Sequence, residues 1–205
     1  MKLNLSVPWR YETDLKKILV GEMLLIRTNY KQAAAVYSEF FKYFPGAEVP
    51  PEKKRDALRI LRKAGLKHRA EGILKALDYL KDREVFDINI DELIKIPYVN
   101  KYIASAVLFF TGQGEIIYPD SNIMRILERY FGIKGKDRTH PSTRQIKLLE
   151  FIITRFKSRE EKRRFSLNLL DFGLTLCLPK NPRCTVCPLR NECCYPPIQT
   201  VHGKI

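Results

Sequence analysis

Five cysteines lie close together near the end of this 205-residue chain, between positions 177 and 194. Four of them have the spacing C-x6-C-x2-C-x5-C, at Cys177, Cys184, Cys187 and Cys193, and Cys194 follows directly. A disulfide scaffold would distribute its cysteines along the chain, so this clustering indicates a metal site in a reducing compartment. Four thiolates suit either a [4Fe–4S] cluster or a tetrahedral zinc ion. Because a zinc ribbon has two C-x-x-C pairs and this motif has one, the spacing favours iron–sulfur but leaves zinc open.

The positive charge of the chain is concentrated in two segments. The net charge is +14. Residues 53–75 contain nine Lys and Arg against two acids, and residues 134–164 contain eleven against four, so each segment carries +7. Concentrated positive charge is typical of proteins that bind a polyanion, most often nucleic acid, although solvated helix faces would look the same. We therefore expect a nucleic-acid partner, subject to the motifs below.

The hydrophobic pattern is helical along almost the whole chain, and no segment alternates as a strand would. Gly132, Gly135 and Pro141 interrupt the pattern and mark a soft boundary near 132–141. The longest apolar run, 106–110, is too short to cross a bilayer, and the N-terminus has no signal-peptide pattern. We therefore predict an all-α protein that is soluble and cytoplasmic. The expected helices cover 14–27, 30–44, 52–63, 67–81, 89–95, 101–112, 121–131, 142–157 and 160–176.

The context of the cysteines carries a family resemblance. The segment LDFGLTLCLPKNPRCTVCPLRNECCY is similar to the C-terminal cluster segment of the endonuclease III and MutY group of helix-hairpin-helix DNA glycosylases. The resemblance implies that the cluster is [4Fe–4S], that it performs no hydrolysis, and that it shapes a basic loop against DNA. It also implies the ligand set, which is Cys177, Cys184, Cys187 and Cys193.

Asp120 stands in Tyr118-Pro119-Asp120-Ser121-Asn122, directly before an expected helix. From the residues alone, an aspartate at this place is a helix N-cap. By resemblance it occupies the position of the family's essential aspartate, where a carboxylate can stabilise an oxocarbenium ion and orient water. The Asp-x-Asn form, with Asn122 beside the DNA, resembles MutY and the thymine-mismatch glycosylases more than endonuclease III, which usually has His there.

Tyr102 stands where bifunctional members of the family place a lysine that forms a Schiff base with the sugar. A phenol cannot form that imine, so the resemblance implies a monofunctional enzyme that leaves an abasic site. Lys101 is one residue away and would face about 100° around the helix. Tyrosine here resembles the Mig-type thymine/uracil mismatch glycosylases, whereas MutY typically has serine. Judged alone, Tyr102 is also consistent with aromatic packing.

The N-terminal segment resembles the opening of the MutY and Mig families, from Pro8-Trp9-Arg10 to Thr28. Glu22 falls on the glutamate of that pattern and would protonate or hold the flipped base. Ile26-Arg27-Thr28 matches the turn that wedges into duplex DNA, where an apolar Ile26 can fill the vacated stack. Read without the family, Glu22 is an ordinary helix glutamate.

The segment Pro97-Tyr98-Val99-Asn100 resembles the phosphate-binding hairpin of the family. The family hairpin has glycines for tight turning, and Tyr98 tolerates left-handed geometry much less well than Asn100. On these residues alone, an ordinary helix–turn–helix corner fits as well. Lys101, Lys67 and Arg69 are further expected DNA contacts.

Together these features resemble a helix-hairpin-helix DNA glycosylase over nearly the whole chain. The implied fold has a six-helix barrel lobe, 21–132, and an iron–sulfur cluster lobe, 1–20 with 133–205. The implied reaction is hydrolysis of the N-glycosidic bond of thymine or uracil opposite guanine in double-stranded DNA, by a monomer associated with the nucleoid and not with a membrane.

Three alternatives stay open. An adenine glycosylase like MutY is second, although such enzymes usually carry an additional C-terminal domain that this sequence does not contain. A bifunctional enzyme like endonuclease III is third, and Tyr102 argues against it. A cluster-bearing DNA-binding module without catalysis is the fourth hypothesis, which Asp120 and Glu22 oppose. Modified cytosines are also possible substrates.

Overall fold

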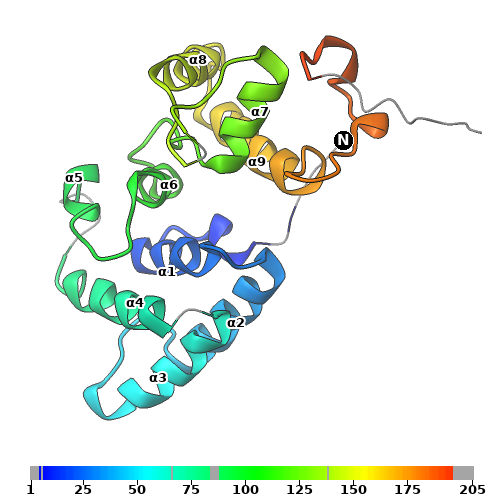
Figure 1. Cartoon of the computed structure of the whole chain (residues 1–205). Helices are drawn as coiled ribbons and strands as arrows, with labels where there is room; N and C mark the ends of the chain where they lie inside the picture. The colour runs from blue at the N-terminus through cyan, green and yellow to red at the C-terminus, as the bar shows by residue number, and fades with distance from the viewer. Residues whose placement is uncertain (1–4, 6, 66, 84–87, 138, 196–205) are drawn as a thin grey trace, which may run out of the picture. The chain divides into compact units, whose positions relative to one another are not determined.

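The computed structural model describes residues 5, 7–65, 67–83, 88–137 and 139–195, and within these ranges its regular elements are all helices (Figure 1). The predicted all-α class is therefore confirmed. The α-helices are α1 (Leu15–Leu25), α2 (Tyr30–Tyr43), α3 (Lys54–Leu61), α4 (Lys67–Tyr79), α5 (Ile90–Leu93), α6 (Lys101–Thr111), α7 (Ser121–Phe131), α8 (Thr143–Ile153) and α9 (Arg159–Thr175). Short 3-10 helices are η1 (Pro8–Tyr11), η2 (Pro51–Lys53), η3 (Arg62–Ala64), η5 (Cys184–Val186) and η6 (Arg190–Glu192).

The chain forms two compact units, one of residues 6–117 and the other of residues 1–5 with 118–205. The lobes that the family resemblance implies, 21–132 and 1–20 with 133–205, stay a prediction. No helix in the described ranges is long and apolar enough to cross a membrane.

Helix α1 is the centre of the first unit, where it packs against η1, α2, α4 and α6 (Figure 1). Eight of its eleven residues are buried, which is typical of a helix that is covered on all sides. The indole of Trp9 lies against Gly21, where a Cβ atom would collide with the ring. The sequence begins the helix here because the Asp14 carboxylate accepts a hydrogen bond from the Lys17 amide.

In the second unit α7 packs against α9, and α8 follows α7 in the chain. Helix α8 ends at Ile153, four residues before the expected end. The chain turns there because the ring of Phe156 packs on Phe165, 4.8 Å between centroids, and because Ser158 then caps α9 through a reciprocal bond pair with Glu161.

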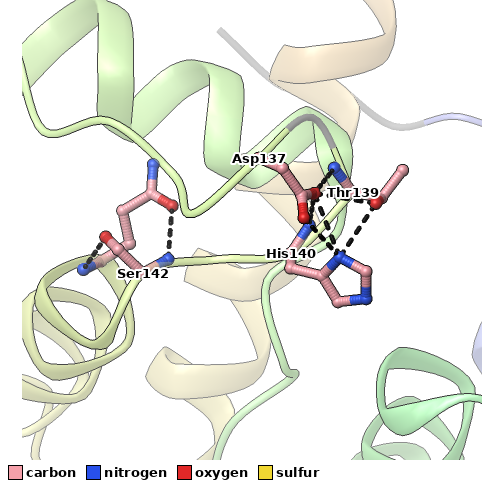
Figure 2. Close-up of polar contacts among 5 residues, drawn as sticks. Asp137, Thr139, His140 and Ser142 are labelled. Carbon is pink, nitrogen blue, oxygen red and sulfur yellow. Dashed lines mark hydrogen bonds and ion pairs between the residues drawn. The ribbon is translucent and has the colours of Figure 1, made fainter.

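The loop between α7 and α8 is organised by one carboxylate. Figure 2 shows Asp137 accepting bonds from the amides of Thr139 and His140, at 2.7 and 2.8 Å, and lying 2.9 Å from the His140 ring. These bonds, chiefly that from the Thr139 amide, hold the pKa of Asp137 well below its usual range. The loop thereby presents Lys134 and Lys136 as exposed cations in the second basic segment, of which Arg138 lies outside the described residues.

Candidate functional site

Asp120 is both the N-cap of α7 and the residue that the family pattern singles out. Its Oδ1 accepts hydrogen bonds from the backbone amides of Asn122, at 3.0 Å, and Ile123, at 2.8 Å. Its Oδ2 accepts one from the Asn122 side-chain amide at 2.7 Å. The two sequence interpretations of this aspartate are therefore compatible, because the cap bonds fix the carboxylate in one orientation.

The Asp120 carboxyl group is in an environment that disfavours its charge. Burial raises the pKa of Asp120, while the bonds from Ile123 and Asn122 and the positive charge of Arg125 act in the opposite direction. The protonated form of Asp120 is therefore the one that the folded protein favours. Its contribution to stability is present at low pH and is lost as pH rises through the raised pKa. A desolvated carboxylate that is held by donors is suited to stabilise developing positive charge.

This environment predicts the pH dependence of base release. If Asp120 has the role that the resemblance implies, only its ionised form can stabilise an oxocarbenium ion, and the single-turnover rate should then fall as pH decreases through its pKa. Since that pKa is raised, the acid limb should lie above the range of an ordinary aspartate. A rate profile measured between pH 4 and pH 9 checks this. A limb at or below the ordinary aspartate value would show that burial does not control this group.

Two arginines of α7 connect the Asp120 end of the helix to the cysteine segment. Arg125 donates from Nη2 to the Asn122 Oδ1 at 2.8 Å and to the Gly173 carbonyl at 2.9 Å, and from Nε to the Cys177 carbonyl at 2.8 Å. One turn later, Arg129 donates from Nη1 to the Leu178 carbonyl at 2.7 Å and lies 3.5 Å from the Cys177 sulfur. Asp120 is thus linked to the cysteine segment through the Asn122 amide and Arg125.

Gly173 of α9 allows this arrangement because a Cβ atom there would lie 2.7 Å from the Asn122 Cβ. We predict that Gly173→Ala forces α7 and α9 apart, costs about 1–3 kcal/mol of unfolding free energy, and slows base release by moving Asn122. Thermal unfolding and single-turnover kinetics measure the two effects. Gly46→Ala is the matched control, since no atom lies within 4 Å of its added Cβ. Equal behaviour of the two variants would contradict this account of Gly173.

The four predicted ligands, Cys177, Cys184, Cys187 and Cys193, line one cavity together with Arg129. All four are partly buried and none forms a disulfide, whereas Cys194 is exposed. The Cys193 thiol lies 3.3 Å from the Arg129 carbonyl. Within the described ranges, no three His, Cys, Asp or Glu side chains converge closely enough to hold a single metal ion.

Glu22 lies in the first unit, on α1, and is 2% exposed. Its Oε1 accepts a hydrogen bond of 2.9 Å from the indole N–H of Trp9, which is fully buried. The expectation from the residues alone, an ordinary helix glutamate, does not describe this side chain, because ordinary glutamates are solvated. The indole fixes one oxygen of the carboxylate.

The hairpin before α6 makes a left-handed turn at a tyrosine. Tyr98 has φ 68° and is half exposed, and its ring lies against Gly72, where a Cβ atom would collide with it. Asn100 is extended and caps α6 by accepting from the Ile103 amide at 2.9 Å. The left-handed conformation thus falls on Tyr98, the residue type that tolerates it less well, and Asn100 is the N-cap of α6. Val99 is buried, and Pro97 precedes Tyr98 on the exposed side of the turn.

Tyr102 and Lys101 occupy the first turn of α6, with Tyr102 partly buried and Lys101 exposed. The wedge segment follows α1, with Ile26 partly buried and Arg27 exposed. Lys67 is exposed at the start of α4.

Arg69 is only 3% exposed and donates to the Leu24 carbonyl and the Thr28 hydroxyl, both at 2.9 Å. Because its side chain is buried, Arg69 can influence DNA binding through the turn that it holds, and not by direct contact with a phosphate.

The predicted residues fall into two groups. Asp120 and Asn122 lie in the same unit as the cysteines. The sequence resemblance did not identify Arg125 and Arg129 as the residues that bond α7 to the cysteine segment. Two arginines four apart on the polar side of a strongly amphipathic helix are the signal that could have found them. The residues of the other unit are Glu22, the wedge 26–28, Lys67, Arg69, the hairpin 97–100, Lys101 and Tyr102.

Comparison with known proteins gives close relatives, although no family model matches. The chain is 31% identical to a thymine-DNA glycosylase of Aeropyrum pernix over 195 residues, which are 93% of this chain and 86% of the relative. It is also 31% identical to a thymine/uracil-DNA glycosylase of Pyrobaculum aerophilum, over 92% of this chain and 84% of the relative. An adenine DNA glycosylase of Buchnera aphidicola is 29% identical, and the chain spans only 54% of its length.

Solved structures agree with the sequence relatives. A thermostable thymine-DNA glycosylase matches with a TM-score of 0.71 and 26% identity, over 93% of this chain and 88% of that one. A non-covalent endonuclease III–DNA complex matches with a TM-score of 0.67 and 21% identity, over 88% and 83%, and supports the fold alone. From these relatives and this fold, the chain belongs to the helix-hairpin-helix DNA glycosylases, in the family that contains the thymine- and thymine/uracil-DNA glycosylases.

Proposed function

We propose that this protein is a monofunctional DNA glycosylase that hydrolyses the N-glycosidic bond of thymine or uracil opposite guanine, in base excision repair. The observation that carries the proposal is the Asp120 carboxylate, which the backbone amides at the start of α7 and the Asn122 side-chain amide hold in an environment where burial raises its pKa. The relatives named for thymine and uracil supply the base class. Such a base in a mismatch costs less to extrude than a paired one.

Each proposed catalytic residue has one task. Asp120 stabilises the positive charge that develops on the sugar and orients the attacking water. Glu22, held by the Trp9 indole, interacts with the flipped base. Tyr102 stands at the position of the family's lysine nucleophile and offers no amine, so the product is an abasic site in an intact strand.

Binding to DNA is proposed to use exposed and turn residues of the first unit. The wedge residue Ile26 fills the place of the extruded base, with Arg27 beside it. The hairpin 97–100 and Lys101 approach the phosphates, as does Lys67. Asn122 of the second unit, besides holding Asp120, is proposed to lie next to the DNA backbone. The basic segments provide the attraction that is independent of sequence.

The cysteine set is proposed to hold a [4Fe–4S] cluster through Cys177, Cys184, Cys187 and Cys193. The four cysteines line one cavity, and their spacing, with one C-x-x-C pair and not two, favours an iron–sulfur core over a zinc ribbon. The Arg129 guanidinium near the Cys177 sulfur suits the negative charge of thiolates. When bound, the cluster supplies a rigid core for the basic loop, and the protein residues perform the hydrolysis.

A second candidate is removal of adenine. It is favoured by the Buchnera relative, an adenine DNA glycosylase that is 29% identical over 92% of this chain. Asp120 would have the same catalytic role, and the two reactions differ in the base that the enzyme removes. We further propose that the protein acts as a monomer on double-stranded DNA, associated with the cytoplasmic nucleoid.

A panel of four duplexes tests the proposal. These carry G·T, G·U, adenine opposite 8-oxoguanine, and thymine glycol. Each duplex is incubated with the protein, and strand cleavage is measured with and without hot alkali. A parallel reaction with borohydride tests for a covalent complex. The proposal predicts alkali-dependent cleavage of G·T or G·U and no trapped complex. Cleavage of the adenine duplex alone would favour the second candidate. Binding without release from any duplex would favour a module without catalysis.

A further inference from the structure

The turn that follows α1 has a backbone conformation that needs support. Arg27 has φ 52°, in the left-handed region that side chains other than glycine rarely adopt. Such a conformation persists when surrounding contacts hold it, and it is found at functional turns. The turn has its own bond from the Thr28 amide to the Leu25 carbonyl at 3.2 Å, and two further bonds come from one residue of a different helix.

That residue is Arg69 of α4. Its Nη1 donates to the Leu24 carbonyl near the end of α1 and to the Thr28 hydroxyl, each at 2.9 Å. The Thr28 hydroxyl lies 2.9 Å from the Ala64 carbonyl and can donate to it. One guanidinium thus connects the start and the end of the turn, and Thr28 extends the connection to the segment before α4.

The arrangement is costly for a purely structural device. Arg69 is 3% exposed, and its Nη2 makes no hydrogen bond within the described part of the chain. Burial, and then the neighbouring positive charge of Arg27, lowers the pKa of Arg69. A buried cation with an unused donor is rare in native structures and requires a reason beyond packing. An apolar side chain would fill the same volume without this penalty.

We propose that Arg69 is a positioning residue that holds the turn 26–28 in the shape that enters the duplex, and that it thereby controls extrusion of the target base and not cleavage of its bond. The inference rests on the proposed function, since it takes Ile26 as the wedge. Arg69 itself touches neither the base nor the sugar. It acts through the turn, which has to stay rigid while Ile26 replaces a stacked base.

Two substrates separate this role from general stability. One is a G·U duplex, and the other is the same duplex with an abasic analogue opposite the uracil, which lowers the cost of extrusion. In single-turnover reactions, Arg69→Met should slow uracil release from the G·U duplex by about tenfold or more, and should stay within about threefold of the natural protein on the second substrate. A 2-aminopurine beside the target should report slower or less complete flipping.

Two further variants keep the test decisive. Thr28→Val removes the hydroxyl that accepts from Arg69 without removing a buried charge, and should shift the two rates in the same direction by a smaller factor. Arg83→Met is the matched control, because Arg83 pairs at the surface with Glu92 and lies over Tyr79, away from the turn. Both rates should be unchanged in that control.

The outcomes are distinguishable. An equal loss on both substrates, or no loss in either Arg69→Met or Thr28→Val, would overturn the positioning role. If Arg69→Met does not fold, Thr28→Val alone decides. Absence of both thymine and uracil release by the natural protein would instead contradict the proposed function, and the 2-aminopurine signal would still report whether Arg69 affects the turn.

Discussion

Asp120→Asn should abolish base release, with a loss of about 10³-fold or more in the single-turnover rate, the scale expected when a group that stabilises transition-state charge is removed. An amide has no negative charge to stabilise the oxocarbenium ion. Affinity for mismatched duplex should stay nearly intact, because no phosphate contact is changed. Quench-flow kinetics and fluorescence anisotropy measure the two quantities.

Folding of this variant should not be impaired. Asparagine caps helices as well as aspartate does, so the bonds from the backbone amides of Asn122 and Ile123 to Oδ1 can persist, while the bond from the Asn122 side-chain amide is lost. Removal of a carboxylate whose pKa is raised by burial should also relieve a cost that the natural protein carries at neutral pH. Asp56→Asn is the control, an exposed first-turn aspartate that pairs with Arg59 at the surface. Undiminished base release by Asp120→Asn would remove Asp120 from the mechanism.

If Cys187 is a ligand of the proposed [4Fe–4S] cluster, Cys187→Ser should remove most of the iron and the visible absorption of that cluster. A serine hydroxyl is a poor substitute for a soft thiolate ligand. Since the energy of cluster binding contributes to folding, the segment 177–193 should become more susceptible to proteolysis. Iron and acid-labile sulfide content, with limited proteolysis, measure the loss.

Cys194→Ser is the matched control for that variant. Cys194 is exposed, and its backbone amide donates to the Tyr130 carbonyl at 3.2 Å. The control should keep its full iron content. Full iron in Cys187→Ser would contradict the ligand set, and one zinc ion per chain in the natural protein would contradict the cluster.

Most of the helices could be predicted from the sequence because their apolar periodicity and their caps agree. Asn29, Asn89, Ser142 and Ser158 each stand directly before a helix and accept an amide bond there. The early end of α8 could not be predicted, because it depends on the packing of Phe156 against Phe165 across a turn.

The residues that bear the chemistry of the candidate site could be predicted from the sequence, whereas the hydrogen bonds that hold them in place could not. The motif around Asp120 and the cysteine spacing indicated the residues that bear the reaction and the cofactor. The buried state of Arg69 was not visible, because an arginine in a basic segment is ordinarily solvated. The contacts of Arg125 with the carbonyls of Gly173 and Cys177 join residues about fifty positions apart, which no local pattern encodes.

The hairpin shows a different limit. Tyrosine tolerates left-handed geometry poorly, yet Tyr98 adopts φ 68°. Gly72 of α4 leaves room for its ring in this conformation. Compensation between distant residues of this kind appears only in the folded structure.

The most direct test of the central claim is the alkali dependence of strand cleavage on a G·U duplex in a single turnover. The natural protein should leave the strand intact until hot alkali is added and then give one break at the position of the uracil, while Asp120→Asn gives none. A G·U duplex that stays uncleaved after alkali, or that is cut by the protein without alkali, would contradict a monofunctional glycosylase acting on this mismatch.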